Sequence, residues 1–180
     1  MSCKTAIALF KDSDIKGNVI FHQCKFGDPV TVMFDLYDLI PERTRAIHIH
    51  EYGDERQGCK SLGGHWNSAG THHGSFQYPR RQRHAGDLIN NFRSDADGRF
   101  KYMYEDPTLN LFGDVEETII GRSVVVHDGI DDLGVGGLNL ETGRVVDPKL
   151  YKESLKTGNA RGRMGCAIIG LANPDVKITG

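Results

Sequence analysis

Short runs of β-forming residues alternate with turn-like segments along most of this chain, and this pattern most constrains its fold. Val, Ile, Phe and Thr gather in brief, partly alternating stretches, and the 180 residues include 22 glycines. Alternation with a period of two, interrupted by turns, is typical of strands in an all-β domain. We therefore predict about eight strands, at residues 5–10, 17–23, 30–36, 45–50, 86–91, 100–104, 119–127 and 164–172.

Two long stretches, residues 51–84 and 128–163, show no sustained periodicity. Loops of that length inside a compact domain are usually functional or disordered. Short strands together with two such loops predict an all-β fold, an eight-stranded Greek-key β-barrel or sandwich of the immunoglobulin-like kind. We expect one domain over residues 1–180, and a short helix at 149–156, bracketed by Pro148 and Gly158.

The formal net charge of −2 gives no global reason to expect a nucleic acid or an anionic membrane as partner. The apolar stretch at residues 5–10 is too short for the core of a signal peptide. No run approaches the ~18 apolar residues of a membrane-spanning helix. We therefore expect a cytoplasmic protein, with neither nucleic acid nor membrane among its partners.

The histidines suggest metal binding. His48 and His50 end a predicted strand, where side chains at i and i+2 share a face and can reach one ion. Such a pair alone is a weak signal, but further candidate ligands occur near strand ends and in the first loop: His65, His73, His84, Asp87 and His127. Imidazole and carboxylate suit a four-ligand zinc site, and imidazole also suits copper. The set predicts two metal sites.

The segment Ala46–Asp54 resembles the copper-binding signature of the copper/zinc superoxide dismutases. Further matching segments follow in the family's order over nearly the whole chain: Gly58–Cys59, Gly63–Asn67, His73–Gly74, Arg83–Leu88, Ile119–His127, Asp131–Gly134, Lys156–Ala160 and Arg163–Cys166. The resemblance implies one copper and one zinc ion per subunit. It also implies conversion of superoxide into dioxygen and hydrogen peroxide as copper cycles between Cu(II) and Cu(I).

The resemblance assigns copper to His48, His50, His65 and His127, and zinc to His65, His73, His84 and Asp87. His65 would bridge the two metals as an imidazolate and supply a proton to the second superoxide. Asp131 would link one copper histidine to one zinc histidine, and Arg163, rather than its neighbour Arg161, would attract the anionic substrate. His72 adjoins His73 and is the one ambiguous ligand candidate, whereas His22 matches no ligand and is expected to be an ordinary strand residue.

None of the four cysteines forms a CxxC pair, so a reducing compartment would leave them as free, mostly buried thiols. The resemblance instead implies a disulfide between Cys59 and Cys166. Cys3 and Cys24 remain expected to be buried or free thiols without an assigned role.

Two regions depart from the family pattern. Residues 138–156 make the second loop about a dozen residues longer than the compact family form, and a tail at 174–180 extends beyond the usual end. The apolar segment Ile168–Leu171 resembles a two-fold contact of the family, so we expect a homodimer. A copper chaperone is a second protein partner that the resemblance allows.

Three other functions are considered. A non-enzymatic metal carrier, such as a copper chaperone-like domain or metal buffer, should lack copper ligands or carry a delivery motif. A zinc hydrolase needs an open zinc position, whereas the four predicted zinc ligands fill the site. A catalytically inactive homologue should have lost part of the site, which here is complete in sequence.

Overall fold

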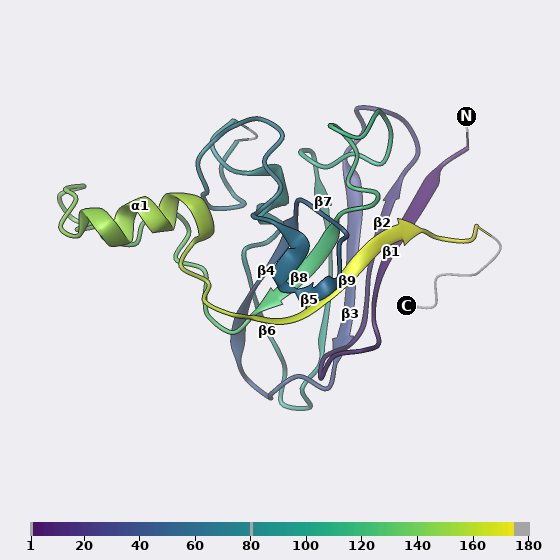
Figure 1. Ribbon diagram of the computed structural model, residues 1–180, viewed down its shortest axis with the longest axis horizontal. Coiled ribbons are helices and arrows are strands. Elements are labelled where there is room, and N and C mark those ends of the chain that lie inside the picture. The colour runs from purple at the N-terminus through teal and green to yellow at the C-terminus, as the bar shows by residue number, and fades with distance from the viewer. Residues whose placement is uncertain (1, 80, 175–180) are drawn as a thin grey trace.

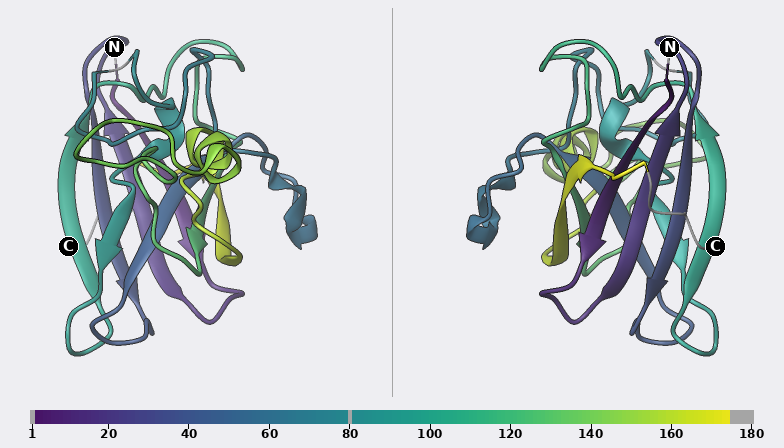
Figure 2. Two further views of the ribbon diagram at one scale, coloured as in Figure 1. Left: turned by 90° about the vertical axis from the view of Figure 1, so that its left-hand side faces the viewer. Right: turned by 90° about the vertical axis from the view of Figure 1, so that its right-hand side faces the viewer.

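Eight antiparallel strands form one sheet that curls into a nearly closed barrel (Figures 1 and 2). This computed structural model describes residues 2–79 and 81–174; most of the C-terminal tail noted above therefore lies outside the described residues. The strands, in chain order, are β1 (Lys4–Phe10), β2 (Lys16–Gln23), β3 (Val30–Tyr37), β4 (Thr44–His50), β6 (Asn91–Arg93), β7 (Phe100–Asp106), β8 (Ser123–His127) and β9 (Arg163–Leu171).

The spatial order is β6-β4-β8-β9-β1-β2-β3-β7, with β6 and β7 as the two edges that face each other where the barrel nearly closes. The chain therefore crosses the barrel between β3 and β4 and again between β7 and β8. These crossovers are the Greek-key connections that the sequence predicts. Across the gap between the two edge strands, the ring centroids of Phe92 and Phe100 lie 4.8 Å apart. The prediction of an eight-stranded Greek-key barrel is confirmed.

β4 and β8 differ from the other long strands because both of their faces are buried. Ile47 and Ile49 of β4 point into the barrel core, as do Val124 and Val126 of β8. Since side chains alternate along a strand, the intervening residues point outward, where loops cover them. This cover is what makes room for a buried polar site on the outside of the barrel.

The strand predicted at residues 86–91 is wrong over most of its length. The chain instead forms a short 3-10 helix, η2 (Ala85–Asp87), and β6 starts only at Asn91. Leu88 and Asn90 have φ values of 45° and 56°, which are incompatible with an extended strand. The apolar residues here are buried by a tight turn rather than by a sheet.

The strand predicted at residues 119–127 begins four residues late, at Ser123. Gly121 has a φ of 87°, and the guanidinium group of Arg122 donates hydrogen bonds to the carbonyls of Thr118 and Glu51. These contacts hold residues 119–122 in a turn before β8.

The first long loop contains a four-residue strand, β5 (Arg56–Cys59), and the 3-10 helix η1 (Lys60–Leu62). The second contains the helix α1 (Pro148–Thr157), as the sequence predicts. The Asp147 side chain accepts hydrogen bonds at the start of α1, and Gly158 ends it in the left-handed conformation. Figure 1 shows α1 projecting to one side of the barrel.

The expectation that Cys3 and Cys24 are buried or free thiols is wrong, because the two residues form a disulfide and both are exposed. Lys4 pairs with Gln23 at the end of the β1–β2 ladder, so the next residues outward face each other. Cys59 is bonded to Cys166, with Cα atoms 5.8 Å apart, which is the pair expected from the sequence. Among the described residues, no helix has the length and apolar character needed to span a bilayer.

Candidate metal centre

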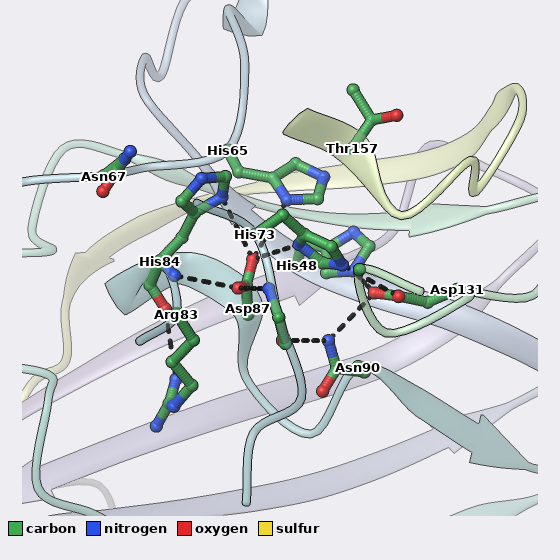
Figure 3. Close-up of polar contacts among 12 residues, drawn as sticks. His48, His65, Asn67, His73, Arg83, His84, Asp87, Asn90, Asp131 and Thr157 are labelled. Carbon is green, nitrogen blue, oxygen red and sulfur yellow. Dashed lines mark hydrogen bonds and ion pairs between the residues drawn. The ribbon is translucent and has the colours of Figure 1, made fainter. Parts of the chain in front are cut away.

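Two sets of buried ligand atoms meet between the barrel and its two long loops. Figure 3 shows the second set together with His48 and Asp131. Within each set, the candidate ligand atoms all lie within 4.8 Å of one another. The first set is His48, His50, His65 and His127; the second is His65, His73, His84 and Asp87. These are the same two groups that the resemblance assigns to copper and zinc.

The barrel supplies most of the first set. His48 and His50 lie on the outer face of β4 because Ile47 and Ile49 occupy the core face. His127 ends β8, whose residues Ser123–Val126 pair with His50–Ile47 of β4. The loop brings His65 back onto β4, where it forms an isolated β-bridge with His50.

Hydrogen bonds determine which nitrogen of each ring faces the first set. His48 Nε2 lies 2.7 Å from Asp131 Oδ2, which leaves His48 Nδ1 buried without a partner. His50 Nδ1 lies 3.0 Å from the Gly63 carbonyl, so His50 Nε2 points inward, 3.2 Å from His127 Nε2. The set therefore presents His48 Nδ1 and the Nε2 atoms of His50 and His127 to a shared centre.

His65 lies between the two sets. Its Nδ1 is 3.1 Å from Asp87 Oδ1 in the second set, while its buried Nε2 has no hydrogen-bond partner. Its ring centroid is 3.9 Å from that of His48 and 5.7 Å from that of His84. One nitrogen therefore faces each set, which is the arrangement that a bridging imidazolate needs.

The second set has dimensions that suit zinc. From Asp87 Oδ1, the distances to the Nδ1 atoms of His73, His65 and His84 are 2.8, 3.1 and 3.3 Å. Tetrahedral bonds of ~2.0–2.1 Å place neighbouring ligand atoms about 3.3 Å apart. Asp87 Oδ2 accepts hydrogen bonds from the backbone N–H groups of Gly74 and His84, which hold the carboxylate in position.

Asp131 joins the two sets through its carboxylate. Oδ2 lies 2.7 Å from His48 Nε2 and Oδ1 lies 2.9 Å from His73 Nε2 (Figure 3). Asn90 Nδ2 donates to Asp131 Oδ2 at 3.0 Å and to the Gly74 carbonyl at 3.1 Å. Sequence reasoning did not identify Asn90, because an asparagine three residues after Asp87 carries no signal of this long-range contact.

Burial lowers the pKa values of the first set, to about 4 for His48, about 3 for His65 and His127, and about 2 for His50. These rings are therefore neutral at pH 7, with lone pairs available to a metal. His73 behaves differently. Burial opposes its charged form, but hydrogen bonds to Asp131 and Asp87 outweigh burial and raise its pKa to about 10.

Asp87 shows the complementary effect. Burial favours its neutral form, but hydrogen bonds from His65, His73 and His84 hold its pKa well below the usual range. The second set therefore combines a carboxylate with a protonated His73 when no metal is bound. In the metal-free protein, the proton on His73 partly replaces the positive charge that zinc would bring.

A cavity of about 380 Å³ opens over His50, His65 and His127 and is also lined by Arg161 and Arg163. The Arg163 guanidinium donates hydrogen bonds to the carbonyls of Cys59 and Gly63, which fix it at the cavity wall. The Cys59–Cys166 disulfide holds one of these carbonyls in place. An anion entering the cavity would meet a positive charge beside the first ligand set.

The remaining histidines lie outside both sets. His72 is exposed, while its neighbour His73 is buried among the ligands. His22 lies in β2, as expected, and its Nε2 is 3.4 Å from Cys24 Sγ.

A Greek-key barrel that carries two buried ligand sets bridged by one histidine defines a binuclear metalloprotein. The family profile "Copper/zinc superoxide dismutase (SODC)" matches residues 15–169. This chain therefore belongs to the copper/zinc superoxide dismutase family.

Relatives extend the match over nearly the full length. A protein named superoxide dismutase [Cu-Zn] from Neurospora crassa is 42% identical over 93% of this chain and 97% of its own. One of the same name from Schizosaccharomyces pombe is 40% identical over 93% of this chain and 97% of its own. A crystal structure of the clock protein EA4 superposes with a TM-score of 0.79 at 33% identity, covering 96% of this chain and 97% of that one.

Proposed function

We propose that this chain is a copper/zinc superoxide dismutase, which converts two superoxide anions and two protons into dioxygen and hydrogen peroxide. The observation that carries the proposal is the position of His65, whose two ring nitrogens face two separate ligand sets. Together with family membership and the charged cavity over the first set, this favours a redox enzyme.

We assign copper to His48, His50, His65 and His127, and zinc to His65, His73, His84 and Asp87. When bound, copper supplies reversible one-electron chemistry, and zinc supplies a fixed positive charge without redox change. The buried nitrogens His48 Nδ1 and His65 Nε2 support this assignment, because neither has a hydrogen-bond partner among the described residues. Asp131 orients one ring from each set through its two oxygens.

The chain's own residues supply substrate binding and protons. Arg163, fixed by two carbonyls, attracts superoxide and donates hydrogen bonds to it at the cavity wall. His65 Nε2 points toward the first set and can hold a proton that the second superoxide needs. His65 therefore has a catalytic role as well as a structural one.

A single domain over residues 1–180 would hold the whole site, because both long loops bring their ligands onto one barrel. The alternative to catalysis is a non-enzymatic copper and zinc carrier. The fixed Arg163 favours the enzyme, since a carrier has no use for a guanidinium held in the wall of a cavity that opens onto the copper ligands.

We also propose a homodimer formed through β9 and its neighbours. Leu9 and Ile168 are 51% and 41% exposed, and both line a groove that Ile7 and Gly170 extend. Light scattering after size-exclusion chromatography should give twice the mass of the chain. Ile168→Lys should give the monomer mass, whereas Val146→Lys, at an exposed position in the second-loop hairpin, should not.

We place the enzyme in the cytoplasm and expect a copper chaperone to load it. Fractionation of the cells that express it, with copper content compared before and after loss of candidate chaperones, tests both points.

The test of the proposed activity is superoxide consumption by the purified protein, with copper and zinc measured on the same sample. We expect rapid dismutation that follows copper content, its loss in His48→Ala, and its retention in the matched variant His72→Ala. Full occupancy by both metals without dismutation would overturn the enzyme and favour the metal carrier.

A further inference from the structure

A third group of metal-ligating side chains lies on the β1–β2 hairpin. Candidate ligand atoms of Cys3, His22 and Cys24 lie within 4.8 Å of one another. β1 and β2 supply no ligand of the metal centre described above, whose barrel ligands come from β4 and β8. The group is therefore separate from the proposed catalytic site.

The strand register explains why these residues meet. Thr5 of β1 pairs with His22 of β2, and one step beyond the Lys4–Gln23 pair, Cys3 and Cys24 are joined by a disulfide. Residues at i and i+2 on a strand share a face, so Thr5 and His22 lie beside the two sulfur atoms. Four side chains capable of polar contacts thus form one patch at the end of the hairpin.

The His22 ring is oriented toward sulfur. Its Nδ1 lies 3.0 Å from Thr5 Oγ1, and its Nε2 lies 3.4 Å from Cys24 Sγ. A hydrogen bond on one ring nitrogen that leaves the other facing a ligand group is the usual arrangement of metal-binding histidines. With the ring proton on Nδ1, donated to Thr5 Oγ1, the lone pair of His22 Nε2 faces the sulfur atoms and is available to a metal.

Access favours chemistry at these cysteines. Cys3 and Cys24 are exposed, whereas Cys59 and Cys166 are half-buried. The Cys59 carbonyl also accepts a hydrogen bond from Arg163. An exposed disulfide is the more readily attacked by an external thiolate. The Cys3–Cys24 bond should therefore be reduced before the Cys59–Cys166 bond.

We propose that reduction of the Cys3–Cys24 disulfide creates a binding site for one Cu(I) ion, formed by the two sulfurs and His22 Nε2. An external dithiol donates two electrons and two protons; its own sulfurs become a disulfide, and the Cys3–Cys24 S–S bond becomes two thiols. Cu(I) then binds as the two thiol protons leave to solvent, with two Cu–S bonds and one Cu–N bond formed. Oxidation of the pair abolishes the site.

Cu(I) is the ion that suits this donor set. Thiolates are soft ligands that select Cu(I), and a three-ligand sulfur and nitrogen set suits its low coordination number. Structural zinc sites almost always take four protein ligands, and the described residues here offer only three. The site is therefore a redox-controlled copper site, independent of whether the chain dismutates superoxide.

The test uses the full-length protein with its metal content already measured. The sample is treated with dithiothreitol, desalted without oxygen, and titrated with Cu(I) against a chromophoric Cu(I) chelator. We expect about one additional copper per chain after reduction and none before it, together with a sulfur-to-copper absorption in the ultraviolet. His22→Ala should still form the disulfide but bind the additional copper at least tenfold more weakly.

The double variant Cys3→Ser/Cys24→Ser is the matched control, because it retains Cys59 and Cys166. It should take up no additional copper after the same reduction, and dismutase activity measured in parallel should be unchanged. The proposal is overturned if the reduced wild-type protein binds no extra copper, or if the double variant binds as much. Equal affinity in His22→Ala, or uptake of zinc in place of Cu(I), would also overturn it.

Discussion

Gly158 packs directly against Asp131: a Cβ atom added at residue 158 would lie 2.3 Å from Asp131 Oδ1 and 2.5 Å from His73 Nε2. The residue that ends α1 therefore packs against the hydrogen bond between Asp131 and His73. That hydrogen bond is one of the two by which Asp131 links the ligand sets. The His73 backbone N–H also donates to the Leu155 carbonyl at 2.8 Å. The helix and the zinc ligands consequently behave as one packed unit.

Gly158→Ala should displace Asp131 from His73 and weaken zinc binding. Gly143→Ala is the matched control, because φ is 66° there and 60° at Gly158, but a Cβ at residue 143 would meet nothing within 4 Å. Both variants place an L-residue at positive φ, which lowers the free energy of unfolding by roughly 1 kcal/mol or more. Only Gly158→Ala adds a steric clash. Zinc release to a chelator should be faster in Gly158→Ala alone; equal rates would contradict the packing argument.

Asp131→Asn should weaken binding of both metals, because His48 and His73 each lose a charged hydrogen-bond partner. Loss of such an orienting carboxylate commonly costs ~10–100-fold in metal affinity. Asp128→Asn changes the same charge at an exposed side chain that pairs with Arg45, and should leave affinity within about twofold of wild type. Chelator competition for zinc and copper separately measures both effects.

Zinc binding to the metal-free protein at pH 7 should release about one more proton than copper binding to the first set. The pKa of His73 is raised to about 10, so its proton is present at pH 7 and must leave before zinc binds. The first-set histidines are already neutral. Apparent zinc affinity should therefore rise about tenfold per pH unit between roughly pH 7 and pH 9.

Calorimetry in buffers of different ionisation enthalpy measures that proton release. In Asp131→Asn the pKa of His73 should fall, because one of the two carboxylates that raise it is gone, and proton release should fall with it. A zinc affinity that does not change with pH would show that His73 is neutral before the metal arrives.

Arg163→Ala should lower kcat/KM for superoxide by about tenfold or more, within the range of electrostatic steering effects. Arg161→Ala should lower it less, since Arg161 is exposed at the cavity rim and no hydrogen bond fixes its guanidinium among the described contacts. Raising the ionic strength should slow the wild-type enzyme more than either variant. Equal losses in the two variants would argue against a special role for the fixed guanidinium.

Cys59→Ser should reduce both stability and activity. Its disulfide spans 107 residues, for which chain entropy predicts a contribution on the order of 4–5 kcal/mol to the free energy of unfolding. It also holds a carbonyl that accepts from Arg163. Removing the 21-residue Cys3–Cys24 bridge should cost about 3 kcal/mol but spare activity, as urea denaturation and superoxide assays on the same samples would show.

Features that depend on neighbours in sequence, such as strand positions and helix ends, were predicted well. Alternation placed β1, β2 and β3 within one residue at each end, and the i, i+2 spacing of His48 and His50 put both on one face of β4. The helix between Pro148 and Gly158 also follows from local capping signals. Each of these features depends on neighbours in sequence.

Features that depend on distant contacts were missed. Residues 86–91 look like a strand in composition, but η2 packs so closely on β4 that a Cβ at Gly86 would lie 2.4 Å from the Ile49 carbonyl. Asn90 and Gly158 support Asp131 only through the tertiary fold. The Cys3–Cys24 disulfide depends on the register of β1 against β2, which sequence alone did not specify.

Within the added length of the second loop, residues 138–145 form a hairpin that is closed by its own backbone. The N–H groups of Val146 and Asp147 both donate to the carbonyl of Gly137, so residues 138–145 leave and return at one point. Behind that point, Asp132 accepts from Ser154 and Asn159 and secures the part of the loop next to the ligands. A foreign peptide grafted between Asn139 and Arg144 would therefore extend outward from the molecule, and this hairpin offers a place where the protein can acquire new segments without altering its chemistry.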